Sequence, residues 1–298
     1  MSTPIDAPEV IETLPAPAKF VHLRVHSEFS MIDGIVRIKE MIKTAVGHHM
    51  PAIALTDQSN MYALVKFYKA ALGAGIKPII GVDIWLENEE ERELPHRLTL
   101  LAQNQEGYRH VTEIISQAYS HNQFDDKAIV RKEWLLEKAA GIIVLSGFRD
   151  GDIGQQIIKG NVDTAEGLLA EYLQYFGDRF YLELQRTNRE NEELVLNVSL
   201  MLAQKLNVPV VATNDIRFIN ADDFEAHETR VCIGESYALA DKRRLKRYSD
   251  QQYFRSPEDM VALFSDIPSA IENTLEIAKR CSVEVELGTY YLPDFPIP

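Results

Sequence analysis

Short runs of β-branched and apolar residues recur along this sequence, and amphipathic stretches separate most of them. Such runs are typical of strands, whereas apolar residues at three- and four-residue spacings are typical of helices. The seven candidate strands cover residues 20–25, 52–56, 78–85, 97–102, 141–146, 180–184 and 209–213. The clearest helical patterns lie at residues 35–49, 61–75 and 192–207. This alternation predicts an α/β fold with mainly parallel strands covered by helices.

The connection between the third and fourth candidate strands breaks the pattern. Only the acidic segment ENEEERELPH joins them, and it is too short for a crossover helix. We therefore expect an antiparallel hairpin, which would bring His96 back to the carboxyl end of the third strand, near Asp83. The remaining units predict a closed or nearly closed barrel, with a doubly wound open sheet as the alternative. After residue 213 we expect the chain to be helical to its end.

Length and composition suit a chain that folds without metal or disulfide support. The 298 residues are 46% hydrophobic, which is enough for one large domain or two small ones. Cys232 and Cys281 lie far apart and form no C-x-x-C pair, so we expect a reducing cytoplasm. No stretch resembles a signal peptide or a membrane span, and no membrane partner is expected.

The ends of the chain differ in composition from its middle. Residues 1–19 are rich in proline and acids, and we expect a disordered leader there. Residues 20–283 would form the barrel with its helical carboxyl-terminal part. The proline-rich residues 284–298 predict an extended linker toward a further domain.

The formal net charge of −14 argues against a surface whose main task is to wrap a phosphate backbone. One local run is basic, and a solvated loop is its ordinary interpretation. The other interpretation is a contact with DNA, a partner protein or a neighbouring domain. The run consists of Lys242, Arg243, Arg244, Lys246 and Arg247.

Histidines and carboxylates follow several of the candidate strands, at the end where parallel α/β folds collect functional groups. A single aspartate after a strand is usually a cap or turn residue. Caps alone would not also supply histidines, and this mixture of ligands suits zinc, manganese or iron. The candidate metal ligands are His26, Asp33, Asp57, Asp83, His96 and Asp215.

Several strings in the sequence resemble the motifs of one family in order and spacing. FVHLRVHSEFSMIDG is similar to the opening of the PHP domain of bacterial polymerase III alpha subunits. Its later motifs are matched by ALTDQSN, KPIIGVDIW, HRLTLLA, VLSGF and VVATNDIRFI. The resemblance implies a distorted seven-stranded α/β barrel within a multidomain DNA polymerase. Metal-competent members bind up to three ions and act as phosphoesterases, and some proofread DNA.

The sequence departs from the metal-binding pattern of that family at several positions. The H-x-H opening reads Arg24-Val25-His26, and Asp83 stands where a bridging glutamate is usual. Residues that are not metal ligands replace four of the pattern's positions in all: Arg24, Gln58, Phe148 and Arg217. The resemblance therefore implies a degenerate metal site, which we expect to be unoccupied, and no catalytic residue is expected in this chain.

The replacements suggest an electrostatic hypothesis. Clustered carboxylates without metal would repel one another strongly in a shielded site. We expect the guanidinium groups of Arg24 and Arg217 to replace the divalent cations by forking onto carboxylates such as Asp57 and Asp215.

The resemblance also implies a role and partners. A non-catalytic domain would support the polymerase and dock the proofreading exonuclease subunit, with DNA contacted only indirectly through the holoenzyme. The remaining domains of the same alpha chain would be further partners, and no cofactor is expected. One alternative is an active metal-dependent phosphoesterase that keeps manganese or zinc at a residual site. A free-standing PHP phosphatase is another.

Overall fold

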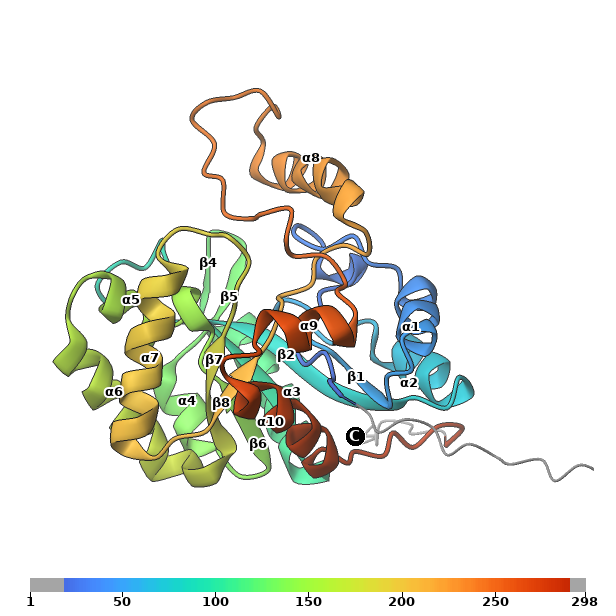
Figure 1. Ribbon diagram of the computed structural model, residues 1–298, viewed down its shortest axis with the longest axis horizontal. Coiled ribbons are helices and arrows are strands. Elements are labelled where there is room, and N and C mark those ends of the chain that lie inside the picture. Colours follow the sequence, from blue (N-terminus) through green and yellow to red (C-terminus); the bar gives the residue numbers. More distant parts are fainter. Residues whose placement is uncertain (1–18, 290–298) are drawn as a thin grey trace, which may run out of the picture.

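The computed structural model describes residues 19–289, and its centre is a β-sheet covered by helices (Figure 1). The strands are β1 (Ala52–Leu55), β2 (Lys77–Leu86), β3 (His96–Ala102), β4 (Gln123–Phe124), β5 (Lys127–Val130), β6 (Ile142–Leu145), β7 (Phe180–Leu184) and β8 (Val210–Ala212). They pair in the order β4-β5-β2-β3-β6-β7-β8, and β1 pairs with β2. β3 runs antiparallel to both β2 and β6, which confirms the predicted hairpin. The β1–β2, β6–β7 and β7–β8 pairs are parallel, as the alternation predicted.

An extended segment at residues 20–27 completes the ring of strands. The backbone N–H of Ala54 donates to the carbonyl of His22 at 2.9 Å, which places the segment beside β1. On its other side, the N–H of His26 donates to the carbonyl of Ile216, also at 2.9 Å. The fold is thus the distorted α/β barrel that the sequence predicted. The prediction of a regular strand at residues 20–25 is wrong. The segment changes partners within a few residues and forms single bridges instead of a ladder.

Helices lie outside the ring of strands, and most of them cover it (Figure 1). They are α1 (Ile38–Gly47), α2 (Leu64–Gly73), α3 (Gln105–His121), α4 (Lys132–Glu137), α5 (Asp152–Ile158), α6 (Val162–Phe176), α7 (Glu192–Leu206), α8 (Phe224–Glu235), α9 (Pro257–Leu263) and α10 (Pro268–Arg280). Short 3-10 helices are η1 (Glu28–Ser30), η2 (Phe148–Asp150), η3 (Gly177–Arg179) and η4 (Ala221–Asp223). Within residues 19–289, no helix is both long and apolar enough to cross a membrane.

Two parts of the fold differ from the sequence prediction. The β4–β5 hairpin was not predicted, because strands of this length carry too few residues for a pattern. The chain after β8 is not continuously helical, since residues 236–256 contain no helix. This long loop and α8 project from the barrel (Figure 1).

The predicted leader and linker lie largely outside the described residues. Residues 1–18 and 290–298 are not described. Residues 284–289 contain no helix or strand, and Val283 and Val285 pack against a small cluster formed by Leu64, Tyr68 and Ile80.

The interior of the barrel is divided into an apolar layer and a charged layer. Side chains alternate along each strand, so Ile79 and Asp83 on β2 share one face, as Tyr181 and Glu183 on β7 do. Ile79 and Tyr181 belong to an apolar cluster that also includes Ile277 of α10. Asp83 and Glu183 lie further toward the carboxyl ends of their strands and are fully buried. The strand alternation thus sets a buried charged layer above an apolar one.

Candidate functional site

Arg24 lies at the centre of the charged layer and pairs with three carboxylates. Its Nη2 atom lies 2.7 Å from Asp83 Oδ2, and its Nη1 atom lies 3.2 Å from Glu183 Oε1. Its Nε atom lies 3.3 Å from Asp215 Oδ1. All four side chains are 0% exposed, so the carboxylates depend on Arg24 for the compensation that water cannot provide.

Arg217 forms a second fork in the same layer. Its Nη2 atom donates to Asp215 Oδ1 at 2.7 Å, and its Nη1 atom lies 2.7 Å from Asp33 Oδ2. Gln252 donates to the other oxygen of Asp215 at 2.8 Å. Asp215 adopts the left-handed backbone conformation, with φ of 45°. The planar guanidinium group therefore links two segments that are 184 positions apart in the sequence.

Asp33 receives donors from three parts of the chain. Besides Arg217, its Oδ2 atom accepts hydrogen bonds from Arg97 Nη2 at 2.7 Å and from the Tyr248 hydroxyl at 2.9 Å. Arg97 also donates to Gln58 Oε1 at 2.8 Å and stacks on the Trp85 ring, 4.5 Å from its centroid. These contacts connect the loop after α8 to the charged layer.

Three aspartates in this cluster are held in the ionised form. Burial opposes ionisation of Asp83, yet the charge of Arg24 lowers its pKa to about 2. Burial likewise opposes ionisation of Asp215 and Asp33, and the charge of Arg217 holds the pKa of each well below its usual range. Burial also opposes the charge of Arg24, but the surrounding carboxylates raise its pKa well above the usual value. The arrangement is a mutually neutralising charge cluster.

Asp57 differs from the other aspartates because serines bind it. Its Oδ1 atom accepts hydrogen bonds from the backbone N–H of Ser27 at 2.6 Å and from the Ser30 hydroxyl at 3.0 Å. The Ser27 hydroxyl donates to Oδ2 at 2.8 Å. The expectation that an arginine would fork onto Asp57 is therefore wrong. Burial is the largest influence here, and it raises the pKa of Asp57.

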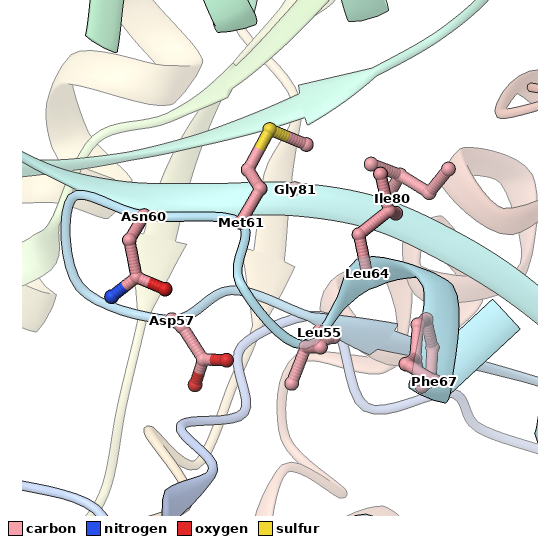
Figure 2. A pocket seen from close by; sticks show the side chains of 8 residues that line it. All are labelled: Leu55, Asp57, Asn60, Met61, Leu64, Phe67, Ile80 and Gly81. Carbon is pink, nitrogen blue, oxygen red and sulfur yellow. The ribbon is translucent and has the colours of Figure 1, made fainter. Parts of the chain in front are cut away.

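A small cavity lies beside Asp57, between the end of β1, the start of α2 and the middle of β2 (Figure 2). Its volume is about 10 Å³, which is room for one water molecule at most. Binding sites for organic ligands usually measure hundreds of Å³. The lining residues are Leu55, Asp57, Asn60, Met61, Leu64, Phe67, Ile80 and Gly81.

His26, Asp83 and Asp215 form the one group in the described part of the chain that brings three potential metal ligands together. Their ligand atoms lie within 4.8 Å of one another. However, the nearest carboxylate oxygens already face guanidinium groups, since Arg24 contacts both aspartates and Arg217 contacts Asp215 at 2.7 Å. A divalent ion at this position would meet fully buried positive charges. As arranged, these residues do not fit a metal ion.

At two of the replaced ligand positions, the side chain has a structural contact instead of a metal-binding role. Gln58 donates from Nε2 to the carbonyl of Asp83 at 2.9 Å and accepts from Arg97, so it belongs to the cluster. Phe148 is 2% exposed and packs in the main hydrophobic core, with φ of 50°. At this position a buried aromatic side chain thus stands where the family pattern has a metal ligand.

The structure contradicts the expected position of His96. In the β2–β3 register, His96 pairs with Leu86, and Thr99 is the residue opposite Asp83. The three-residue offset corresponds to about 10 Å along the strand. His96 instead lines an open hollow of about 290 Å³ together with Asp152. Burial there lowers its pKa.

Four important residues of the cluster were not predicted from the sequence: Glu183, Arg97, Ser30 and Tyr248. Glu183 carried a detectable signal, because an acid inside the apolar run FYLEL shares a face with its neighbours at two-residue spacing. Arg97 sits next to His96, so only the strand register shows which of the two faces inward. Tyr248 lies on a loop, and no local pattern reports its contact.

The basic run is largely neutralised by nearby acids. Arg243 pairs with Asp241, Arg244 with Glu228, and Arg247 with Glu235. The Arg244 side chain is only 5% exposed and ties the loop to α8. Within residues 19–289, the two lysines of the run, Lys242 and Lys246, have no ion-pair partner.

The sequence that forms this barrel and its charge cluster matches one described family. The sequence matches the PHP domain over residues 22–187, which is more than half of the chain, so the chain belongs to the PHP domain family. It is 56% identical over 279 residues to the DNA polymerase III subunit alpha of Pseudomonas aeruginosa. It is 48% identical over 278 residues to the subunit of the same name from Escherichia coli.

These matches cover most of this chain and a smaller part of each relative. They include 94% of this chain for the first relative and 93% for the second. The chain spans about a quarter of the length of the curated relatives it matches, 24% in both cases.

Two solved structures show weaker similarity. An amidohydrolase from Chromobacterium violaceum gives a TM-score of 0.45 at 14% identity, covering 75% of this chain and 99% of that one. A putative metal-dependent phosphoesterase from Bifidobacterium adolescentis gives a TM-score of 0.40 at 11% identity, covering 83% and 96%.

Proposed function

We propose that this chain is a non-catalytic PHP domain of a replicative DNA polymerase III alpha subunit and that its charge cluster stabilises the barrel. The observation that carries the proposal is the position of Arg24, which compensates three fully buried carboxylates. Two of them, Asp83 and Asp215, belong to the group of potential metal ligands. The similarity to alpha subunits supports the assignment to replication. The domain would work in the cytoplasm with the remaining domains of the same alpha chain.

The cluster supports a structural role for two reasons. Removing one partner from a buried ion pair lowers the stability of a fold by about 3–5 kcal/mol. The stability of the barrel should therefore depend on each arginine of the cluster. The cavity beside Asp57 also has no room for a phosphate ester. The role of the domain would then be to hold a rigid surface for other parts of the replication machinery.

The same proposal includes a separate proofreading exonuclease subunit as a partner. A domain without its own hydrolytic chemistry can be complemented by an exonuclease that binds to it, with DNA contacted through the assembled holoenzyme. Gel filtration of this chain mixed with the exonuclease subunit of the same bacterium tests the partnership. Co-elution is the expected result, and separate elution at concentrations of about 10 μM would contradict an affinity in the micromolar range.

Metal analysis tests the non-catalytic assignment. The purified chain, dialysed against manganese and zinc and then washed, should retain neither metal near one ion per chain. It should also show no phosphatase turnover that EDTA removes, while a metal-dependent PHP phosphatase treated in parallel serves as the positive control.

The second candidate is an active phosphoesterase with a reduced metal site. The grouping of His26, Asp83 and Asp215 favours it, because three protein ligands are enough for a catalytic zinc ion. Near-stoichiometric manganese or zinc together with chelator-sensitive turnover would establish this candidate and refute the structural proposal.

A further inference from the structure

The helix α8 and the loop after it project from the barrel (Figure 1). A group of large apolar side chains is exposed in this region. The most exposed are Ile233 at 72%, Leu245 at 62% and Met31 at 57%. Isolated exposed apolar residues need no explanation, but a group on one projection indicates a contact site. We call this group the α8 surface; it consists of Met31, Ile32, Ile233, Tyr237, Leu239 and Leu245.

The α8 surface joins two segments that are far apart in the sequence. The Nε atom of Arg230 donates to the carbonyl of Met31 at 2.6 Å. Ile32 packs so closely on α8 that a methyl group at Gly234 would lie 2.6 Å from Ile32 Cγ2. The turn after η1 and the end of α8 therefore form one continuous surface.

The loop that carries Tyr237, Leu239 and Leu245 is anchored at two points. Arg244 pairs with Glu228 of α8, and both side chains are nearly buried. Tyr248 donates its hydroxyl hydrogen to Asp33 in the charge cluster at 2.9 Å. A loop held in this way loses less conformational entropy when it binds a partner.

The charges of the α8 surface indicate the chemistry of its partner. The arginines of the basic run pair with acids of this chain, which leaves the ammonium groups of Lys242 and Lys246 exposed. Arg230 of α8 is also exposed and forms no ion pair among the described residues. Three free cations are few for a nucleic-acid backbone, which is bound through many Lys and Arg contacts. An apolar centre with a small positive excess instead fits a protein surface that carries acids around its apolar residues.

We propose that the α8 surface is the docking face for another domain of the longer polypeptide to which this chain is similar. The curated relatives are about four times as long as the part that matches. A domain in the same polypeptide is present at a high effective concentration and can cover an apolar face permanently. The inference rests on the proposed function, because it assigns a surface to one of the partners named there.

Site-specific cysteine labelling tests this assignment. Ile233→Cys and Leu245→Cys are introduced separately into the 298-residue chain and into the full-length alpha polypeptide. Mass spectrometry then follows the rate of maleimide addition at each introduced residue. The native Cys232 and Cys281 are 3% and 1% exposed, so they compete little. Leu72→Cys on α2, where Leu72 is 53% exposed, is the matched control.

We expect labelling of both sites to be about tenfold slower, or more, in the full-length polypeptide, while the Leu72 control keeps its rate. Equal rates in the two chains would overturn the proposal. Labelling that slows with rising concentration of the 298-residue chain would assign the surface to a second copy instead. Protection that requires the added exonuclease subunit would assign it to that partner.

Charge reversal gives a second, independent test. Lys242→Glu combined with Lys246→Glu should speed labelling of Leu245→Cys in the full-length polypeptide, because the two introduced carboxylates would repel an acidic partner. Lys205→Glu on α7 is the charge control, and it should leave the labelling rate unchanged. No effect of the double reversal would refute the acidic partner. None of these labelling rates depends on bound metal. The metal analysis can therefore contradict the proposed function while the labelling supports the docking face, and the labelling can contradict the docking face while the metal analysis supports the proposed function.

Discussion

Arg217 shows most directly how single residues support this fold. It forks between Asp215 and Asp33, and its side chain is 0% exposed. The two carboxylates come from segments far apart in the sequence, which a backbone hydrogen bond from Ile35 to the carbonyl of Arg217 also joins at 3.0 Å. One guanidinium group thus supplies both neutralisation and a long-range connection.

Replacement of Arg217 by alanine should destabilise the domain by about 3–5 kcal/mol, because it leaves buried carboxylates without their partner. Urea unfolding followed by circular dichroism measures the change. Lys205→Ala serves as the control, since it removes an exposed ion pair with Glu166 and should have almost no effect. An unchanged unfolding midpoint for Arg217→Ala would refute the structural role of the cluster.

His22 provides a pH-dependent test at a second buried site. Burial lowers the pKa of His22 to about 4, although its hydrogen bond to the carbonyl of Arg255 opposes the shift. In the unfolded chain His22 therefore binds a proton near pH 6.5, whereas in the folded chain it binds the proton only near pH 4. Stability should fall as the pH falls through this window.

The contribution of His22 should be about 2 kcal/mol between pH 7 and pH 5. His22→Gln removes the titrating group and should reduce the loss of stability over this range by that amount. Urea unfolding of both proteins at the two pH values measures the difference. Identical pH dependence in the two proteins would show that His22 does not titrate as described.

At the scale of elements, strand parity decided which side chains reach the charge cluster. The sequence predicted the β2–β3 hairpin correctly, yet it did not reveal the register. Successive residues of a strand face opposite sides, so Arg97 faces the cluster and its neighbour His96 does not. A shift of one residue would have exchanged their positions, and no local pattern reports such a shift.

The contact between α3 and the start of β6 offers a test at this scale. A methyl group added at Gly107 would lie 1.7 Å from the carbonyl oxygen of Gly141, which is rigid backbone. Gly107→Ala should therefore cost at least about 2 kcal/mol. Thermal unfolding measures the loss, and a stability equal to wild type would contradict this packing.

Gly167→Ala on α6 is the matched control for that experiment. Apart from the neighbouring residues and the backbone of its own helix, no described atom lies within 4 Å of the methyl group that it adds. Alanine there should be neutral or should stabilise the domain by up to about 1 kcal/mol.

At the scale of the whole molecule, α10 closes the apolar end of the barrel. Ile277, Ala278 and Cys281 pack in the same cluster as Ile79 and other interior residues of the strands. The PHP match ends at residue 187, but the barrel interior is filled by residues much later in the chain. The fold is therefore complete only when this last helix is in place.

Ile277→Ala should lower the free energy of unfolding by about 2–5 kcal/mol, because it opens a cavity at a fully buried site. Glu272→Ala, on the exposed side of the same helix, should change stability little. Urea unfolding compares them. Similar small effects of the two substitutions would indicate that α10 does not close the barrel.

The sequence by itself determined the α/β class, the antiparallel hairpin and the gathering of most acids at one end of the barrel. These properties follow from local spacing and from the direction of the strands, which can be read residue by residue. The resemblance to PHP domains of polymerase III alpha subunits was also readable, and the comparisons confirm it.

Only the tertiary structure decided how the charges pair. It joined Arg217 to Asp33 across 184 positions, replaced the expected arginine at Asp57 with serines, and matched the arginines of the basic run to acids. The contacts of Arg217 and Asp57 depend on the approach of segments that are far apart in the sequence. Such contacts leave no periodic trace in the sequence, because the energy that selects them arises only when the barrel closes and excludes water.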